Sequence, residues 1–419
     1  MENNSILDKI INNQKAEDIA ELNAIEIVSN LLSELADREK DILVRRFGLH
    51  GQGRETLEKV GQIHKLTRER VRQIEVSSIK KLHQATKLED YIAVLKKVIN
   101  ELLEEHGGIM EREYLLSILS KFSINSDGRD GKDGVTHKNH LEFLISKLLH
   151  NEFEEVGNSD IFLNYYKLKY KTLDHLEELS KELISEIEKA KRVFGTEELI
   201  NLSSGLGSYA KHKEEFNVPQ SLDIFTILNN EFKEQKADVI NNNKVLYSLF
   251  KSLRKVEQNK FGQWGIFDWR EIKPKTINDK VYLVLKNHGK PMHFVEIADQ
   301  INNVNFDDKK ANAATVHNEL ILDDKYVLVG RGFYGLKEWG YKEGTVADVI
   351  KDILAVSKEP LSRDEIIEKV LGKRIVKKTT IILALMNKEM FEKVGDKYKL
   401  AETFNSASGN ASVGGNSQA

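Results

Sequence analysis

The chain has 419 residues, 40% of them hydrophobic and 31% charged, with a formal net charge of −3 at pH 7. This length predicts about two to four domains, and the composition is typical of a helix-rich, charge-rich globular protein. No apolar run is long enough to span a membrane, the opening residues do not resemble an export signal, and the absence of cysteine excludes disulfides and cysteine-ligated zinc.

Basic residues are concentrated near the N-terminus. Residues 31–87 hold 13 Lys and Arg against 8 Asp and Glu, a net charge of +5 that leaves −8 for the rest of the chain. Nucleic-acid binding depends on where the charge lies more than on its sum, so we expect a phosphate-binding surface mainly in this part.

The first 30 residues are polar and carry only a weak helical period. We predict that residues 1–30 form a leader helix that packs on the next module. A frayed N-terminus is the alternative interpretation.

Residues 31–88 contain two helical patterns separated by a glycine-bearing break. Asp37 is the expected N-cap of the second of two short helices before the break, and Gly48 is expected to end that helix. Thr56 then caps a short helix, from which Leu57, Val60 and Ile63 are expected to face inward.

Thr67 is the expected N-cap of a longer helix that reads RERVRQIEVSSIKKL. At about 100° per residue, its apolar side chains gather on one side and Glu69, Arg72 and Gln73 on the other, with Arg68 beside them. Arg bonds bidentately to guanine, Gln to adenine, and Glu accepts from cytosine, so this face suits base reading in the major groove. The alternative is a solvated helix face with internal ion pairs such as Glu69–Arg72.

Residues 31–84 resemble region 4 of the sigma-70 family of bacterial transcription initiation factors. The resemblance rests on REKDILVRRFGL, on TLEKVG, and on LTRERVRQIE followed by a basic KKL ending. It implies a helix-turn-helix that reads the −35 promoter element and packs on the β flap of the RNA polymerase core. The 30 residues before Leu31 are too few for the promoter-melting domain of full sigma factors, so we expect that this chain alone does not open a promoter.

The same resemblance implies which residues bind DNA. By position, Arg68, Glu69 and Gln73 are the base readers, with Arg72 beside them. Positions near the DNA backbone or groove edge are held by Arg38, Arg46, Leu57 and Glu58, and we add Thr67, Lys80 and Lys81 at the two ends of the helix.

Residues 89–170 show a different pattern of three helices followed by a strand-turn-strand, which is the order of a winged helix. The polar stretch 123–134 has aspartates spaced by three residues, so we predict a loop and not a calcium site. His137 and His140 match no metal-ligand spacing and are predicted to be surface residues.

The strand-turn-strand pattern recurs at 153–168, 255–269, 326–339 and 391–400. Each copy follows a helix, so we predict a mainly α fold in which tandem winged helices with small β-hairpin wings follow the helix-turn-helix. The copy in residues 171–273 is the most divergent. We expect the aromatic residues of the hairpins, such as Trp264 and Tyr334, to be core residues.

Residues 274–341 resemble the HARE-HTH winged helix, which is found in the delta subunit of some bacterial RNA polymerases. The stretch TVHNEL and the hairpin YVLVGRGFYGLKEWGY carry this resemblance. Arg331 at the tip of the hairpin is a candidate for minor-groove insertion, and a plain turn is the alternative.

Residues 342–402 are predicted to be a shorter winged helix. Its third helix is expected to begin with Lys373 and Arg374 and to carry Lys377, Lys378 and Thr379, which suit phosphate contact, although a solvated helix start is the alternative. Residues 403–419 are rich in Gly, Ser, Asn and Ala and are predicted to be disordered.

These patterns favour a DNA-binding transcription protein that contacts promoter DNA and RNA polymerase in the cytoplasm, at the nucleoid. The first alternative is a delta-like polymerase accessory protein without sequence-specific DNA binding. An enzyme acting on DNA is the second and weakest alternative, because no catalytic motif stands out. We expect no cofactor, no metal, no membrane contact and no small-molecule substrate.

Overall fold

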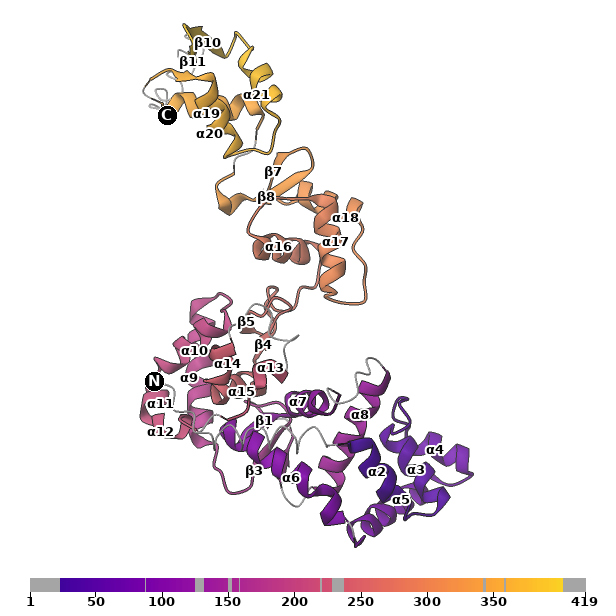
Figure 1. The fold of residues 1–419 in the computed structure, drawn as a ribbon. Helices are drawn as coiled ribbons and strands as arrows, with labels where there is room; N and C mark the ends of the chain where they lie inside the picture. The colour runs from indigo at the N-terminus through magenta and orange to yellow at the C-terminus, as the bar shows by residue number, and fades with distance from the viewer. Residues whose placement is uncertain are drawn as a thin grey trace, which may run out of the picture. The chain divides into compact units, whose positions relative to one another are not determined.

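A computed structural model describes residues 23–86, 88–124, 132–149, 153–157, 159–218, 221–227, 237–341, 344–357 and 359–401. Its chain divides into two compact units, one ending at Ile272 and one beginning at Lys273 (Figure 1). The predicted mainly α fold with small antiparallel sheets is confirmed in both units. Predictions for residues 1–22, for most of the polar stretch 123–134 and for the tail 403–419 lie outside the described residues.

The first unit begins with four helices: α2 (Ala24–Leu32), α3 (Asp37–Phe47), α4 (Leu57–His64) and α5 (Arg68–His83). Asp37 is the first residue of α3 and not its N-cap, because Ala36 occupies the N-cap position. The N–H of Ala36 donates to the carboxylate of Glu39 at 3.3 Å. Gly48 ends α3 in the left-handed conformation, as predicted. Ile63 is 45% exposed, so the prediction that it faces inward is wrong.

A winged helix follows the helix-turn-helix. Its elements are α6 (Leu88–Glu105), β1 (Ile109–Glu111), α7 (Arg112–Ile124), α8 (Lys132–Phe143), the π-helical turn η1 (Leu144–Leu148), β2 (Phe153–Val156) and β3 (Tyr165–Leu168). The three strands form an antiparallel sheet in the order β1-β3-β2, with Phe153 opposite Leu168.

The rest of the first unit departs from a regular winged helix. Its helices are α9 (Asp174–Ala190), α10 (Thr196–Ser204), α11 (Gly207–Lys211), α12 (Lys213–Phe216), α13 (Ile224–Ile227), α14 (Ala237–Asn241) and α15 (Lys244–Ser252). They are followed by a two-stranded sheet of β4 (Val256–Gln258) and β5 (Trp264–Ile266).

One apolar core runs through the whole first unit. It extends from Ala24 in α2 to Ile266 in β5 and includes Phe47 and Leu82 of the helix-turn-helix. Helix α2 packs on α8 and α6, and α15 packs on β1. Residues 31–88, 89–170 and 171–273, which were predicted as successive modules, therefore share a core.

Polar contacts also cross the first unit. The ammonium of Lys244 in α15 is fully buried and lies 2.5 Å from a carboxylate oxygen of Glu105 at the end of α6. The backbone N–H groups of Ser221 and Leu222 donate to the same carboxylate. A buried charge that is paired and hydrogen-bonded in this way fixes how its two elements sit together.

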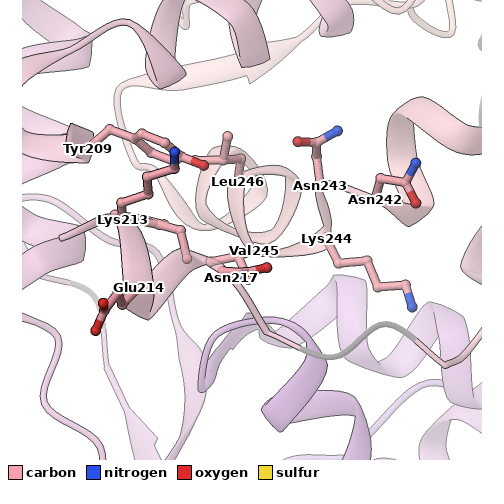
Figure 2. A pocket seen from close by; sticks show the side chains of 10 residues that line it. Tyr209, Lys213, Glu214, Asn217, Asn242, Asn243, Lys244, Val245 and Leu246 are labelled. Atoms are coloured by element: carbon pink, nitrogen blue, oxygen red, sulfur yellow. The ribbon is translucent and has the colours of Figure 1, made fainter.

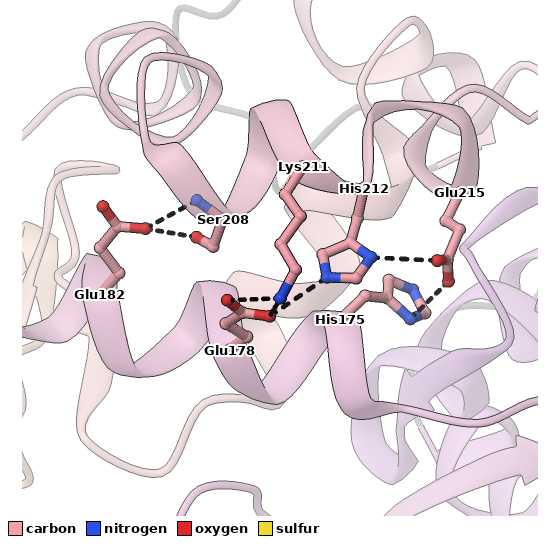
Figure 3. A network of polar contacts seen from close by, with 7 residues as sticks. All are labelled: His175, Glu178, Glu182, Ser208, Lys211, His212 and Glu215. Atoms are coloured by element: carbon pink, nitrogen blue, oxygen red, sulfur yellow. Dashed lines mark hydrogen bonds and ion pairs between the residues drawn. The ribbon is translucent and has the colours of Figure 1, made fainter.

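A second polar network joins α9 to α11 and α12 (Figure 3). His175, which is buried, lies with Nδ1 2.8 Å from Glu215, and the ring of His212 lies between Glu215 and Glu178 at 3.2 and 3.1 Å. Burial of His175 lowers its pKa, although Glu215 acts in the opposite direction. The network explains why the short helices α11 and α12 are held on the long charged helix α9.

The second unit contains two winged helices. The first consists of α16 (Ile277–His288), β6 (Met292–His293), α17 (Phe294–Val304), α18 (Ala313–Leu322), β7 (Tyr326–Gly330), β8 (Phe333–Leu336) and the 3-10 turn η2 (Lys337–Trp339). The second consists of α19 (Val346–Val356), β9 (Leu361–Ser362), α20 (Arg363–Leu371), α21 (Lys378–Leu385), β10 (Phe391–Val394) and β11 (Lys397–Leu400). Their sheets have the orders β6-β8-β7 and β10-β11-β9.

Arg374 joins these two winged helices. It is buried, and its guanidinium donates to the carbonyls of Leu328 at 2.7 Å and Gly344 at 2.6 Å. Next to it, the N–H of Ile375 donates to the carbonyl of Val329 on β7. The prediction that Arg374 begins the third helix is therefore wrong, because α21 starts at Lys378 and Arg374 lies in the junction between the modules.

Candidate nucleic-acid interface

Threonine caps begin both α4 and α5, and a glycine in α4 packs against the turn between the two helices. Thr56 accepts from the N–H of Lys59 at 3.3 Å and Thr67 from the N–H of Arg70 at 3.2 Å, so both predicted N-caps are confirmed. A Cβ on Gly61 would lie 2.7 Å from the carbonyl oxygen of Leu66, which approaches α4 closely where the chain reverses. The turn therefore sets the angle at which α5 leaves α4.

The inner side of α5 is anchored by a small core and one ion pair. Val71 packs with Ile42 of α3 and Val60 of α4, and all three are fully buried. Nε of Arg46 lies 2.7 Å from Glu75 of α5, and its Nη1 donates to the carbonyl of Glu55. Arg46 thus connects α3 to α5 and to the turn before α4.

The outer side of α5 carries the predicted base readers, and the structure brings them together. Arg68, Glu69, Arg72 and Gln73 are all exposed. Arg72 donates from Nε and Nη2 to the carboxylate of Glu69 at 2.8–3.2 Å, and Arg70 donates to the amide oxygen of Gln73 at 3.1 Å. The internal ion pair considered from the sequence is therefore present on the same face as the base readers.

This ion pair affects the titration of both partners. Hydrogen bonding to Arg72 lowers the pKa of Glu69, and hydrogen bonding to Glu69 raises the pKa of Arg72. Both side chains are therefore charged at neutral pH. Because the pair is exposed to water, its bonds are weak and are readily exchanged for bonds to a ligand.

The other predicted DNA-binding residues of this segment divide into three groups. Lys81 forms an ion pair with Glu39 of α3 at 2.7 Å, and Arg38 donates to the carbonyl of His64 at the end of α4 at 2.8 Å. Both side chains thus hold helices together while remaining exposed. Lys80 is exposed and has no ion pair among the described residues. Leu57 is half-buried against the small core of the helix-turn-helix.

The helix-turn-helix is seated on α8 and η1, the third helical segment of the winged helix that follows. Phe47 packs on Phe143 with ring centroids 4.9 Å apart, and Asn139 donates to the carbonyl of Gly48 at 2.9 Å. On the other side, Nε2 of His83 lies 2.8 Å from the carbonyl oxygen of Lys147. The contacts leave the outer side of α5 exposed and fix its direction within the first unit.

His137 and His140 of α8 are buried, so the prediction that they are surface residues is wrong. Burial lowers the pKa of His137 to about 4 and also lowers the pKa of His140. Both side chains are therefore neutral at pH 7. Exposure could not be judged from their spacing, because it results from the helices that cover α8.

The candidate residues of the second unit lie apart from one another along the chain. Arg331 is exposed at the tip of the wing between β7 and β8. Lys377 is the N-cap residue of α21, and Lys378 and Thr379 form its exposed first turn. Such residues are suitably placed for phosphate contact at a helix start.

Comparison with known families agrees with these two regions. Residues 31–84 match the family described as sigma-70, region 4. Residues 275–339 match HARE-HTH, a helix-turn-helix domain whose description names ASXL and restriction endonucleases among the proteins that carry it. The chain joins a sigma-70 region 4 domain to a HARE-HTH domain. Both resemblances are confirmed, and both domains are DNA-binding domains.

Similar curated proteins match the sigma-70 region 4 part. They include the RNA polymerase sigma factors SigA of Microcystis aeruginosa and SigA of Synechocystis sp., each 43% identical over 70 residues, and SigA1 of Synechococcus elongatus, 41% identical over 70 residues. The match covers 16% of this chain and 16–18% of those proteins. It supports a sigma-like DNA-binding role in transcription.

One residue of the region 4 face was not singled out from the sequence. Val76 is 56% exposed, although most large apolar residues of the first unit are buried. It follows Glu69, Arg72 and Gln73 at the next position of the same helical row. The spacing i, i+3, i+4, i+7, which recognition helices use in the major groove, was the signal that could have identified it.

A polar cavity of about 370 Å³ lies elsewhere in the first unit, between α12 and the start of α15 (Figure 2). Asn217, Asn242 and Asn243 contribute amide groups to its lining.

No group of three or more acidic, His or Cys side chains that could hold a metal ion occurs among the described residues. Within the described part of the chain, no helix is long and apolar enough to cross a membrane.

Proposed function

We propose that this chain is a transcription protein that reads −35-like promoter DNA with the outer side of α5. One observation supports this proposal most strongly. Within the sigma-70 region 4 match, exposed Arg, Glu and Gln side chains stand together on a helix whose inner side is anchored by a core and an ion pair. A helix that is held rigidly in this way is suited to reading base edges in the major groove.

In the proposed mechanism, DNA binding exchanges bonds within α5 for bonds to bases. Arg72 and Glu69 separate from each other, so that Arg reaches a guanine and Glu a cytosine, and Gln73 leaves Arg70 for an adenine. Arg68 reads a base next to these contacts. Lys80 contacts a phosphate and makes binding salt-dependent, because each phosphate contact adds about 0.9 to the slope of log affinity against log salt concentration. No covalent step is involved, and we propose no cofactor.

We further propose that the chain associates with the RNA polymerase core, through the β flap, in the cytoplasm at the nucleoid. The matched relatives are named RNA polymerase sigma factors, which supports this partner. Because the match spans only 16–18% of those relatives, promoter opening is not included in the proposal.

The proposal is tested by selecting bound sequences from random duplex DNA, with and without core polymerase, for the wild type and Gln73→Ala. We expect enrichment of a −35-like hexamer that Gln73→Ala relaxes at one position, with a discrimination loss of about 1–3 kcal/mol. If neither condition enriches any sequence, the proposal is wrong.

A second candidate is a delta-like polymerase accessory factor that does not read sequence. It is favoured by the HARE-HTH match of residues 275–339. The resemblance of this module to the HARE-HTH family implies a winged helix of the kind found in the delta subunit of some bacterial RNA polymerases. The same selection separates the two candidates. Capture by polymerase without any enriched DNA sequence would support the accessory role.

A further inference from the structure

Val76 lies in line with the proposed base readers of α5. The role that we infer for it rests on the proposed function, in which this helix reads DNA. Glu69, Arg72, Gln73 and Val76 occupy positions i, i+3, i+4 and i+7, so they form a single row along its outer side. Homeodomain recognition helices read the major groove with residues at the same spacing. Val76 is thus the fourth member of a reading row and not an isolated surface residue.

The fold does not require valine at this position. Val76 is 56% exposed and lies outside the small core of Val71, Ile42 and Val60. A β-branched side chain is also a poorer helix former than alanine on an exposed helix surface. Neither packing nor helix propensity accounts for this side chain, so its role is better sought in what α5 contacts.

The chemistry of the major groove identifies the contact. Among the groups that base pairs present in this groove, the C5 methyl of thymine is the apolar one. The neighbouring members of the row are polar and match polar base edges. We propose that Val76 is a specificity-determining residue that packs on a thymine methyl group, next to the base contacted by Gln73.

The test removes the methyl groups of Val76 in the protein and the methyl group of one thymine in the DNA. Binding of the full chain is measured on the selected duplex and on duplexes in which one thymine at a time is replaced by deoxyuridine. We expect that at one position the replacement weakens wild-type binding about fourfold, the size of one buried methyl group. Val76→Ala should bind thymine DNA about fourfold more weakly and should not respond to deoxyuridine at that position.

A matched control is available in the same unit. Val94 is 38% exposed and lies in α6, outside the helix-turn-helix, so we expect Val94→Ala to remove the same atoms without affecting binding. Because alanine favours the helix, Val76→Ala should unfold at the same denaturant concentration as the wild type or above it. A loss of affinity would therefore not reflect loss of folding.

Each outcome is decisive. One outcome is that deoxyuridine at no position weakens wild-type binding; another is that it weakens the binding of the wild type and of Val76→Ala by the same factor. In either case Val76 does not read thymine, while the proposed function stands. If the wild type prefers no sequence, both proposals are overturned. Coupling between Val76 and a single thymine supports both.

Discussion

At the scale of single residues, both sides of α5 carry charged side chains, but these side chains have different roles. Glu75 on the inner side is paired with Arg46, whereas Glu69 on the outer side is paired with its neighbour Arg72 in water. A charge held between elements stabilises the fold, and an exposed pair on one helix contributes little to it. Residue type alone does not distinguish the two situations.

Arg46 provides a test of this distinction. We expect Arg46→Ala to lower the free energy of unfolding of the first unit by about 2–3 kcal/mol, because charged hydrogen bonds to Glu75 and to the carbonyl of Glu55 are lost. Denaturant unfolding measures the effect. Gln73→Ala should leave unfolding unchanged and weaken DNA binding. The reverse result, a stable Arg46→Ala that has lost DNA affinity, would assign Arg46 to the DNA contact instead.

His137 should make the first unit sensitive to acid. Its pKa falls from 6.5 to about 4 on burial, so the unfolded chain binds more protons than the folded chain between these values. Stability is then complete above pH 6.5 and decreases as the pH falls through this window, by about 3 kcal/mol in total.

His137→Leu removes this contribution, so its unfolding free energy should depend less on pH between 6.5 and 4. Part of the dependence should remain, because burial also lowers the pKa of His106 to about 4. Denaturant unfolding at a series of pH values provides the measurement. Identical pH profiles for the wild type and the variant would contradict the assignment.

At the scale of elements, the helix-turn-helix depends on its turn. Gly61→Ala would place a Cβ 2.7 Å from the carbonyl of Leu66, so either α4 or the turn must shift. We expect a loss of about 1–3 kcal/mol in unfolding free energy and weaker DNA binding, since the direction of α5 changes.

Gly53→Ala is the matched control, because a Cβ there meets nothing within 4 Å. Its unfolding free energy should remain within about 0.5 kcal/mol of the wild type. Calorimetry and DNA titration of both variants test the prediction. Equal stability of the two variants would show that the turn tolerates a side chain.

Elements could be predicted from sequence where local chemistry determines them. Thr56, Thr67 and Gly48 act within a few residues of their own positions, and all three predictions are confirmed. Ile63 was misplaced because α4 has only eight residues, too few for periodicity to define its buried side. The outer side of α5 was predicted for the opposite reason, since sixteen residues define its two sides clearly.

At the scale of the whole molecule, the sequence indicated which segments form modules but not which modules share a core. Apolar periodicity shows that a side chain is buried without showing which neighbour covers it. The common core of the first unit therefore had no signal in the sequence. For the same reason, Arg374 was mistaken for a phosphate contact, because its two carbonyl partners lie 30 and 46 residues away.

Arg374 should couple the two winged helices of the second unit. Arg374→Ala leaves the carbonyls of Leu328 and Gly344 without this donor, so we expect faster hydrogen exchange at the N–H of Ile375, which bonds to Val329 across the junction. Arg374→Lys should not restore protection, because one ammonium lacks the fork of a guanidinium. Lys373→Ala, an exposed neighbour, is the control. Unchanged exchange in Arg374→Ala would mean that the junction is held by other contacts.

The seating of the helix-turn-helix on α8 determines how the protein can be dissected. A fragment that ends after α5 would present Phe47, Leu49 and Leu82 to water, although these side chains lie in the common core of the first unit. Such a fragment should self-associate, since it exposes a contiguous apolar surface. The helix-turn-helix is therefore not an independent domain that can be transferred alone. Chimeric proteins designed to use its DNA specificity need to include the winged helix that follows it.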